Sequence, residues 1–538
     1  MKLNKILTFG LFLLPAFALQ SCLKDQEDTF DGSASARVEK YLSEAQKTLQ
    51  SSQYGWVLEN FPDANQKYGG YTYTLKFQGD TVITHSEQDG SNGVVSLYSM
   101  KNVDGPVLSF DTYNKQLHDF ATPNSNSNVG KGGDFEFVID SIGGDLIKVH
   151  GNRNQNTMYL RKLTEPAANY IAKVEQTAAQ FGLAFATGTL AGQNVQLQFD
   201  RDNRQVLISD GTNEVQTSYC VTADGIRFFE PVTLGGNTVS ELTYSDNNLS
   251  LTGNNSQLTG IYDPSIITRA IGSIGSDDNA FSRTLNNLPH LDQFNITTSA
   301  SWLTATASGS SLQLSATANN TGDARSAKVT ITSKMSATIK SSFSVSQMTM
   351  NDIIGHYKFI YVNSDNQRVN ATAEIALNGS ALNLIVKTQL LGGNMTLTFP
   401  VEFDQASGSL AIQAGMPIYN QQLTLHTSSG QAVQGYVISA FEFGDGYLSY
   451  RNTVYGLMPF GHDDTNGTYA QMGNMKFPQN IGDYAVEGLV IYFAKVQNPT
   501  SQDETIGMID EWKNCTLIKT TAASPAKANF LMPVAAKP

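Results

Sequence analysis

The sequence predicts a mainly β protein built from several domains. Short segments in which polar and apolar residues alternate recur along the chain, and clusters of Gly, Asp and Asn separate them. Charged residues make up only 15% of the composition while Ser, Thr, Asn and Gly are abundant, a balance typical of β proteins with polar outer faces and many turns. At about 100–200 residues per domain, a chain of 538 residues has room for several.

The clearest predicted strands have a period of two. They cover residues 71–77, 195–199, 328–332 and 399–403. The dipeptide Asn378-Gly379 stands between two alternating segments and predicts a β-hairpin.

Two helices are predicted, over residues 36–53 and 164–181, because apolar side chains recur there at helical spacing. Gly55 can end the first helix. Each helix is followed by strands, so residues 36–163 and 164–262 are predicted to be two α+β units with a shared pattern.

The first residues predict export from the cytoplasm. Lys2 and Lys5 precede an apolar run over residues 6–19, which is shorter than the roughly 20 residues that a membrane-spanning helix needs and matches a secretory signal. The tetrapeptide Leu-Gln-Ser-Cys that ends at Cys22 resembles the bacterial lipobox. The resemblance implies a signal peptide over residues 1–21 and lipidation of Cys22; the alternative is an ordinary signal followed by an incidental cysteine.

An acidic segment follows the cysteine, within a predicted lipid-anchored tether over residues 22–35. Its charged residues are Lys24, Asp25, Glu27 and Asp28. The segment resembles the lipoprotein export signal of Bacteroidetes, which implies an outer-membrane protein that faces the cell exterior. A solvated, disordered tether would have the same composition.

The charge of the chain excludes some classes of partner. The formal net charge is −13, and removal of residues 1–21 takes away two lysines and no acid, which makes it −15. Nucleic acids and anionic lipids need clustered basic residues, so no nucleic-acid partner is predicted. After Leu19 no apolar stretch approaches 18 residues, so the lipid is the predicted link to the membrane.

Residues 263–350 are rich in Ser, Thr and Ala and poor in charge. The dipeptide Trp302-Leu303, an arginine before an alternating strand and a final Val-x-Gln at 345–347 resemble the BACON domain. The resemblance implies a small immunoglobulin-like β-sandwich with Trp302 inside it.

Residues 36–262 resemble an uncharacterised lipoprotein family of Bacteroidetes. The phrase from Leu108 to Phe120 and the later Gly-Asp-Phe-Glu-Phe at 133–137 carry the resemblance. Members of the family are often encoded beside SusC/SusD-type uptake systems, which implies SusC/SusD-type transporter proteins as partners but no mechanism. Residues 351–520 predict a further β-barrel or sandwich, and residues 521–538 a flexible tail.

No catalytic motif is found in the sequence, and no metal or cofactor is predicted. Cys220 and Cys515 are too few for a disulfide framework or a zinc site and are predicted to be buried. The polar residues of the family phrase are candidates for a site, with a turn held by their side chains as the alternative. They are Asp111, Asn114, His118 and Asp119.

Aromatic side chains are the residues most relevant to glycan binding, because the apolar faces of sugar rings stack on exposed aromatic rings. The candidates are Trp56, Tyr71, Tyr73, Tyr450, Tyr455 and Trp512. An aromatic side chain in an alternating strand more often belongs to a core.

The sequence therefore predicts a non-enzymatic accessory of a nutrient-uptake system that binds a glycan or glycoprotein. This prediction rests on the family setting. One alternative is a structural scaffold that spaces other components of the transporter complex. Another is a hydrolase with an unrecognised pair of carboxylates.

Overall fold

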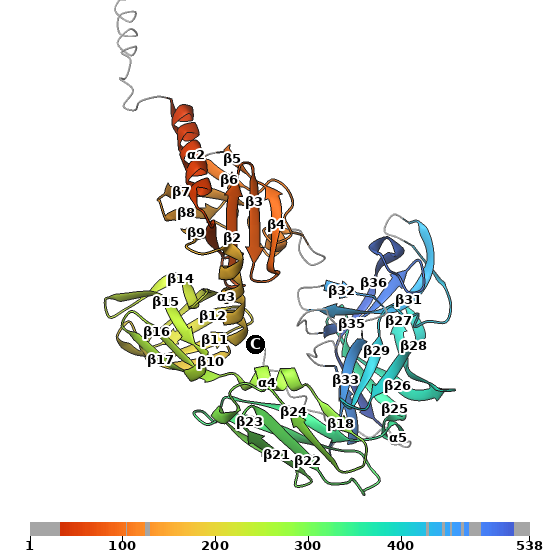
Figure 1. Cartoon of the computed structure of the whole chain (residues 1–538). Coiled ribbons are helices and arrows are strands. Elements are labelled where there is room, and N and C mark those ends of the chain that lie inside the picture. Colours follow the sequence, from red (N-terminus) through yellow and green to blue (C-terminus); the bar gives the residue numbers. More distant parts are fainter. Residues whose placement is uncertain are drawn as a thin grey trace, which may run out of the picture. The chain divides into compact units, whose positions relative to one another are not determined.

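The computed structural model describes residues 33–103, 105–123, 130–426, 430–443, 447–451, 455–463, 467–472 and 486–520. Cys22 and the charged residues Lys24, Asp25, Glu27 and Asp28 lie outside the described residues. The chain divides into two compact units, which we describe separately. The described residues are mainly β, as predicted (Figure 1).

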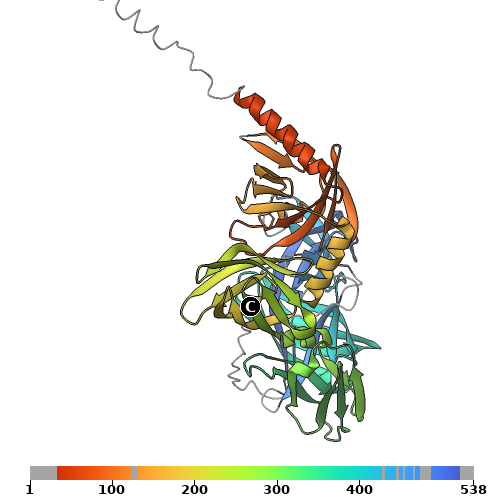
Figure 2. The same ribbon diagram turned by 60° about the vertical axis from the view of Figure 1, so that its left-hand side comes forward.

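The first unit contains a nine-stranded antiparallel sheet in the order β4-β3-β2-β1-β9-β8-β7-β6-β5. Its strands are β1 (Trp56–Asn60), β2 (Tyr71–Gln78), β3 (Thr81–Ser86), β4 (Gly90–Leu97), β5 (Ser99–Asn102), β6 (Pro106–Ser109), β7 (Glu136–Ile142), β8 (Leu146–Gly151) and β9 (Thr157–Lys162). Helix α2 (Ala34–Ser51) confirms the first predicted helix and packs against β2, β5 and β6, and Figures 1 and 2 show it alongside this sheet.

The sheet is curled so that its two edge strands adjoin. Along the chain only Tyr98 separates β4 from β5. In the strand order of the sheet, however, β4 and β5 are the two opposite edge strands. The segment that follows β6 lies in this opening, because the Leu97 amide donates to Thr112 Oγ1 at 2.8 Å and the Ser99 hydroxyl donates to Asp111. The chain itself thereby covers the ends of both edge strands next to Tyr98, and a covered edge is less available for pairing with another molecule.

The second unit begins with the C-terminal part of helix α3 (Ala167–Gln180) and a closed barrel of eight antiparallel strands. The strands are β10 (Leu183–Leu190), β11 (Gln193–Asp200), β12 (Gln205–Ser209), β13 (Glu214–Val221), β14 (Gly225–Leu234), β15 (Asn237–Ser245), β16 (Ser250–Gly253) and β17 (Ser256–Tyr262). Pairing of β10 with β17 closes the barrel, and at this size side chains fill the interior. Helix α4 (Pro264–Ile271) follows, and Asp263 caps it by accepting from the Ser265 amide at 2.8 Å.

A two-sheet sandwich comes next. One sheet has the order β18-β24-β23-β20 and the other β19-β22-β21. The strands are β18 (Ile274–Ser276), β19 (Phe281–Leu285), β20 (Phe294–Thr298), β21 (Leu303–Ser308), β22 (Ser311–Ala316), β23 (Arg325–Ser333) and β24 (Lys340–Gln347). Their inward side chains, among them Leu314, Val329 and Phe343, are buried, so the two sheets share one apolar core.

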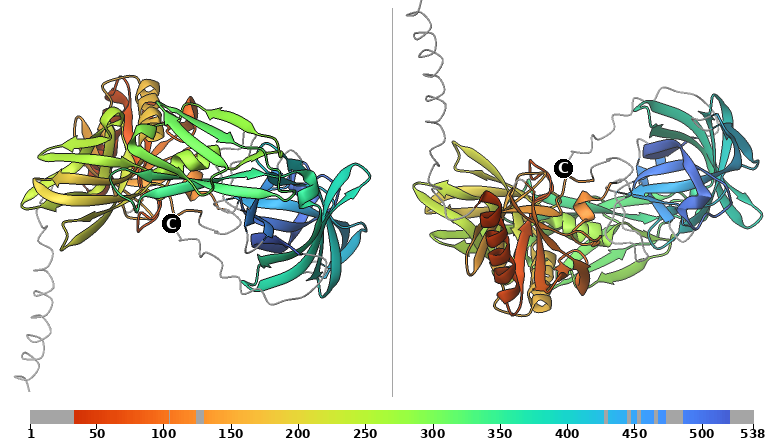
Figure 3. Two further views of the ribbon diagram at one scale, coloured as in Figure 1. Left: turned by 90° about the horizontal axis from the view of Figure 1, so that it is seen from below. Right: turned by 90° about the horizontal axis from the view of Figure 1, so that it is seen from above.

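The C-terminal domain follows the short helix α5 (Met350–Ile353). Its strands are β25 (Gly355–Val362), β26 (Arg368–Asn378), β27 (Ala381–Leu390), β28 (Gly393–Asp404), β29 (Ser409–Gln413), β30 (Leu423–His426), β31 (Ala432–Phe443), β32 (Tyr447–Ser449), β33 (Tyr455–Asp463), β34 (Gly467–Gln471), β35 (Val486–Ala494) and β36 (Thr505–Lys519). Because β25 also pairs with β36, the strands β25-β26-β27-β28-β29-β33-β34-β36 are hydrogen-bonded in a ring, and Figure 3 shows their curvature. The predicted hairpin at Asn378-Gly379 is confirmed, since Asn378 pairs with Ala381 and Gly379 adopts a φ of 65°.

Candidate functional site

Three of the aromatic side chains proposed to stack on sugars are buried, so that interpretation is wrong for them. Trp56 and Trp512 are 0% exposed and Tyr73 is 1% exposed. The Trp56 indole donates to the Leu49 carbonyl oxygen at 2.8 Å, and burial raises the pKa of Tyr73. Trp56 lies on β1, a strand whose residues are all buried, and Trp512 belongs to the hydrophobic core of the C-terminal domain.

The remaining three candidates do not form a platform in the described part of the chain. Tyr71 is half-buried, with its ring centroid 4.7 Å from that of Phe120. Tyr450 is half-buried and stacks on Tyr492 at 6.3 Å. The side chain of Tyr455 lies outside the described residues.

The polar residues of the family phrase do not converge on one point. Asp111 forms an ion pair with Lys101 and accepts from the Ser109 hydroxyl at 2.8 Å. Asp119 begins the 3-10 helix η1 (Asp119–Ala121) and is exposed. The alternative interpretation, in which side chains hold a turn, therefore describes this segment better than a polar binding site.

Asn114 is the centre of that turn. Its side chain is 0% exposed, and its Nδ2 donates to Thr84 Oγ1 at 3.1 Å and to Ser96 Oγ at 3.0 Å. Its Oδ1 accepts from the amides of Gln116 and Leu117 at 3.0 and 3.3 Å. One buried amide thus ties the segment to strands β3 and β4, which explains an asparagine at this position.

The same turn presents a row of three rings that we call the aromatic row: Tyr113, His118 and Phe135. His118 stacks on Phe135 with ring centroids 4.8 Å apart and an angle of 19° between the planes. The ring centroid of Tyr113 lies 5.4 Å from that of His118, and the two ring planes are tilted by 41°. Tyr113 is 68% exposed and Phe135 is 40% exposed, so both ends of the row face solvent.

Phe135 is exposed because its neighbour is anchored inward. Asp134 is buried and accepts from the backbone amides of Arg153 and Asn154 at 2.7 and 2.9 Å. Burial of this carboxyl raises its pKa. A buried carboxyl beside an exposed phenylalanine reverses the usual preference, and such a reversal is more informative than either residue alone.

His118 contacts both of the other rings and is half-buried. Partial burial lowers its pKa below the ordinary value, and this outweighs its backbone contacts with Asn114. The two exposed rings of the aromatic row, Tyr113 and Phe135, offer apolar surface to solvent. Exposed aromatic surface of this kind marks interaction sites.

Tyr113 and Phe135 were not among the residues predicted from the sequence, although both lie within the segments that carry the family resemblance. The signal was their position next to polar residues that the fold buries, Asn114 and Asp134. Which neighbour points inward depends on backbone donors far away in the sequence, and alternation alone does not reveal them.

A separate polar cluster organises one end of the sandwich. The Gln347 side chain, 0% exposed, accepts from Arg325 Nε and Nη2 at 2.8 and 2.6 Å. The Arg325 guanidinium lies 4.4 Å from the centroid of the Trp302 ring, a cation–π contact. Trp302 is half-buried, which corrects the expectation that it lies inside the sandwich: the arginine covers one of its faces.

Across the described ranges, no group of three or more His, Cys, Asp and Glu side chains is placed to hold a metal ion. Within the same ranges no helix is long and apolar enough to cross a membrane. The prediction that Cys220 and Cys515 are buried is confirmed, and both are free thiols.

The fold and these sites define a mainly β, multidomain protein with a binding-type module. Residues 26–246 match the family model described as "Domain of unknown function (DUF4302)", and residues 293–348 match BACON, described as "Putative binding domain, N-terminal". A DUF4302 domain and a BACON domain are therefore present, which confirms the BACON resemblance. Among curated proteins, nothing matches the chain. The BACON domain suggests a binding role.

Proposed function

We propose that this protein is a non-enzymatic lipoprotein of the outer membrane that faces the cell exterior and binds a glycan or glycoprotein as an accessory of a SusC/SusD-type uptake system. The exposed aromatic row, Tyr113–His118–Phe135, carries the proposal. Tyr113 and Phe135 are its exposed rings, and an exposed ring face is what the C–H face of a sugar requires. The BACON domain supports a binding role, and the leader that ends at Cys22 supports the anchor.

Glycan binding is tested by a glycan array and affinity gels with residues 31–538. The double variant Tyr113→Ala/Phe135→Ala is expected to bind a retained glycan about tenfold more weakly or worse, because each lost aromatic contact is worth about 0.5–1.5 kcal/mol beyond its buried area. Leu146→Ala is the matched control, since Leu146 is also in the first unit and 41% exposed. Equal retention by the double variant would exclude the aromatic row, and no retention of any glycan by the native chain would exclude the glycan role.

The anchor is tested separately by Cys22→Ser in the full chain. We expect this variant to lose incorporation of a radiolabelled fatty acid and to leave the membrane fraction, because one residue supplies the attachment point. Cys220→Ser, which changes a buried thiol, is expected to stay anchored. Degradation of the native protein on intact cells by added protease would support exposure at the cell surface, and protection would place the protein on the periplasmic side.

One observation favours the scaffold alternative as a second candidate. In the second unit, the sandwich is fixed to the C-terminal domain: the Gly275 amide donates to the Ala406 carbonyl at 2.8 Å, and Ser326 Oγ bonds both the amide and the carbonyl of His462 at 2.9 Å. A side chain at Gly275 would have its Cβ 2.3 Å from Gly408 N. Backbone bonds and close approach are typical of a rigid joint, which a spacer needs.

A further inference from the structure

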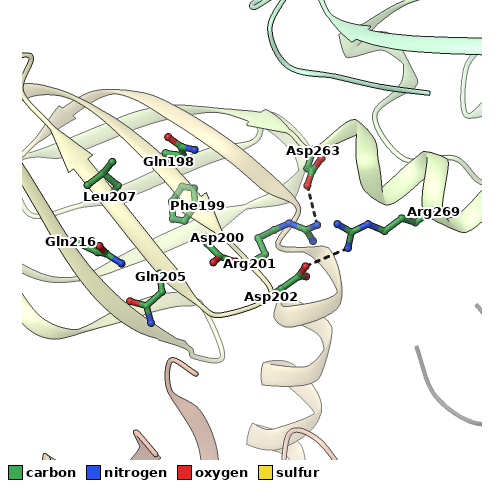
Figure 4. Close-up of a pocket in the computed structure, with 10 residues that line it drawn as sticks. All are labelled: Gln198, Phe199, Asp200, Arg201, Asp202, Gln205, Leu207, Gln216, Asp263 and Arg269. Carbon is green, nitrogen blue, oxygen red and sulfur yellow. Dashed lines mark hydrogen bonds and ion pairs between the residues drawn. The ribbon is translucent and has the colours of Figure 1, made fainter. Parts of the chain in front are cut away.

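The outer face of the barrel carries a polar pocket that is separate from the aromatic row. Its cavity volume is about 460 Å³, within the range of about 300–1,000 Å³ typical of small-ligand sites. The residues that line it come from β11, β12, β13, the β11–β12 turn and helix α4 with its cap (Figure 4). They are Gln198, Phe199, Asp200, Arg201, Asp202, Gln205, Leu207, Gln216, Asp263 and Arg269.

The floor of the pocket is a row of three side chains on adjacent strands. Gln198 pairs with Leu207 across β11 and β12, and Leu207 pairs with Gln216 across β12 and β13. Side chains at paired positions point to the same face of a sheet, so a half-buried leucine is flanked by two amides. Gln198 and Gln216 are exposed, and neither amide forms a side-chain hydrogen bond within the described part of the chain. The row therefore combines an apolar patch with open donors and acceptors.

The rim of the pocket holds two guanidinium groups that carboxylates already neutralise. Arg201 Nη2 donates to Asp263 Oδ2 at 3.1 Å, and Arg269 Nη1 lies 3.6 Å from Asp202 Oδ2. Figure 4 shows the two guanidinium groups facing each other between these carboxylates. Asp263 is fixed in turn, because its Oδ1 accepts from the Ser265 amide at 2.8 Å. The remaining N–H groups of Arg201 have defined directions, since one end of the guanidinium is held.

The charge balance selects the class of ligand. The lining contains two arginines and three aspartates, which gives a formal charge of −1. An anionic ligand would have to displace the carboxylates from the arginines, and a cation would meet the guanidinium groups. A neutral molecule with many hydroxyl groups instead finds both donors and acceptors, and an apolar patch on which to rest.

We infer that this pocket binds a neutral saccharide. One sugar ring rests its C–H face on Leu207, and its hydroxyl groups bond the amides of Gln198 and Gln216 and the open N–H groups of Arg201. The site lies on the barrel, so binding here does not need the aromatic row.

The test uses saturation-transfer NMR on residues 31–538 that carry Tyr113→Ala/Phe135→Ala, so that the aromatic row does not contribute. The probes are hexasaccharides of α-1,4-glucose, β-1,4-glucose, β-1,4-xylose and β-1,4-mannose. We expect at least one probe to bind in this background, and Gln198→Ala/Gln216→Ala to weaken its binding about tenfold or more, because each lost neutral hydrogen bond contributes about 0.5–1.5 kcal/mol. Gln257→Ala, at an exposed barrel position on β17, is the matched control and is expected to bind normally.

Binding that changes little between low and high salt would further support a neutral ligand. The inference is overturned if no probe binds in the Tyr113→Ala/Phe135→Ala background, or if Gln198→Ala/Gln216→Ala leaves binding unchanged. It is also overturned if oligogalacturonate, an acidic saccharide, binds in preference to every neutral probe. Because the aromatic row is absent from this experiment, these outcomes leave the function proposed above untouched.

Discussion

Trp512→Ala is expected to lower the free energy of unfolding of the C-terminal domain by about 3–5 kcal/mol, the usual cost of removing a large buried ring. Trp512 is 0% exposed and stacks on Tyr361 with ring centroids 4.3 Å apart. The ring centroids of Phe359 and Phe399 lie 5.7 and 6.1 Å from that of Trp512. The truncation opens a cavity at the centre of this aromatic cluster and leaves the Asp510 carboxylate without the indole N–H that donates to it at 2.8 Å.

Urea unfolding followed by far-ultraviolet circular dichroism measures the effect. Because the chain has several domains, its unfolding curve can contain several transitions. The native chain and the variants are compared at the transition that Trp512→Ala shifts. Met508→Ala is the matched control on the same strand: Met508 is 51% exposed, and the expected change is within about 0.5 kcal/mol. If Trp512→Ala unfolded like the native chain, Trp512 would not be a core residue, and its earlier interpretation as a sugar contact would return.

Asn114→Ala is expected to lower the stability of the first unit by about 2–4 kcal/mol, because each buried polar group left without a partner costs about 1–3 kcal/mol. The variant removes the acceptor of two backbone amides and the donor to two hydroxyl groups. The segment across the opening between β4 and β5 would then lose its main attachment. Asn114→Asp is expected to be damaging as well, because it replaces the donating Nδ2 and buries a charge.

Tyr113→Ala is the control for Asn114→Ala, since it changes the adjacent residue, whose side chain is 68% exposed. We expect Tyr113→Ala to retain the native melting temperature and to affect only glycan binding. The opposite result, a stable Asn114→Ala and an unstable Tyr113→Ala, would mean that the buried amide does not hold the turn.

The sequence predicted the mainly β class, several of the elements and the BACON domain. Local signals specify the alternating strands, the first helix and the hairpin at Asn378-Gly379, because each depends on residues close together in the chain. Strand pairings between residues far apart in the chain could not be predicted from the sequence. Closure of the barrel depends on the pairing of β10 with β17. The edge strands β4 and β5 of the first sheet do not pair with each other, so that sheet stays open.

For the aromatic row, the sequence predicted the segment in which it lies but not the exposed rings that form it. The family phrase drew attention to the correct segment, but it singled out Asp111 and Asn114, which hold the turn. The exposed Tyr113 and Phe135 were passed over because exposure is set by distant contacts, such as those of Asp134 with the turn at Arg153. Trp56 failed as a sugar contact for a related reason: its whole strand is buried on both faces.

Closure of the barrel also determines which stretch of the chain is needed for a barrel without open edges. The family match ends at residue 246, between β15 and β16, while the strand that seals the barrel runs to Tyr262. A gene fragment inherited only to residue 246 would encode a barrel with two unpaired edges, on β10 and β15, and exposed edges favour aggregation. An intact barrel therefore requires the chain as far as Tyr262, because β17 supplies the strand that pairs with β10.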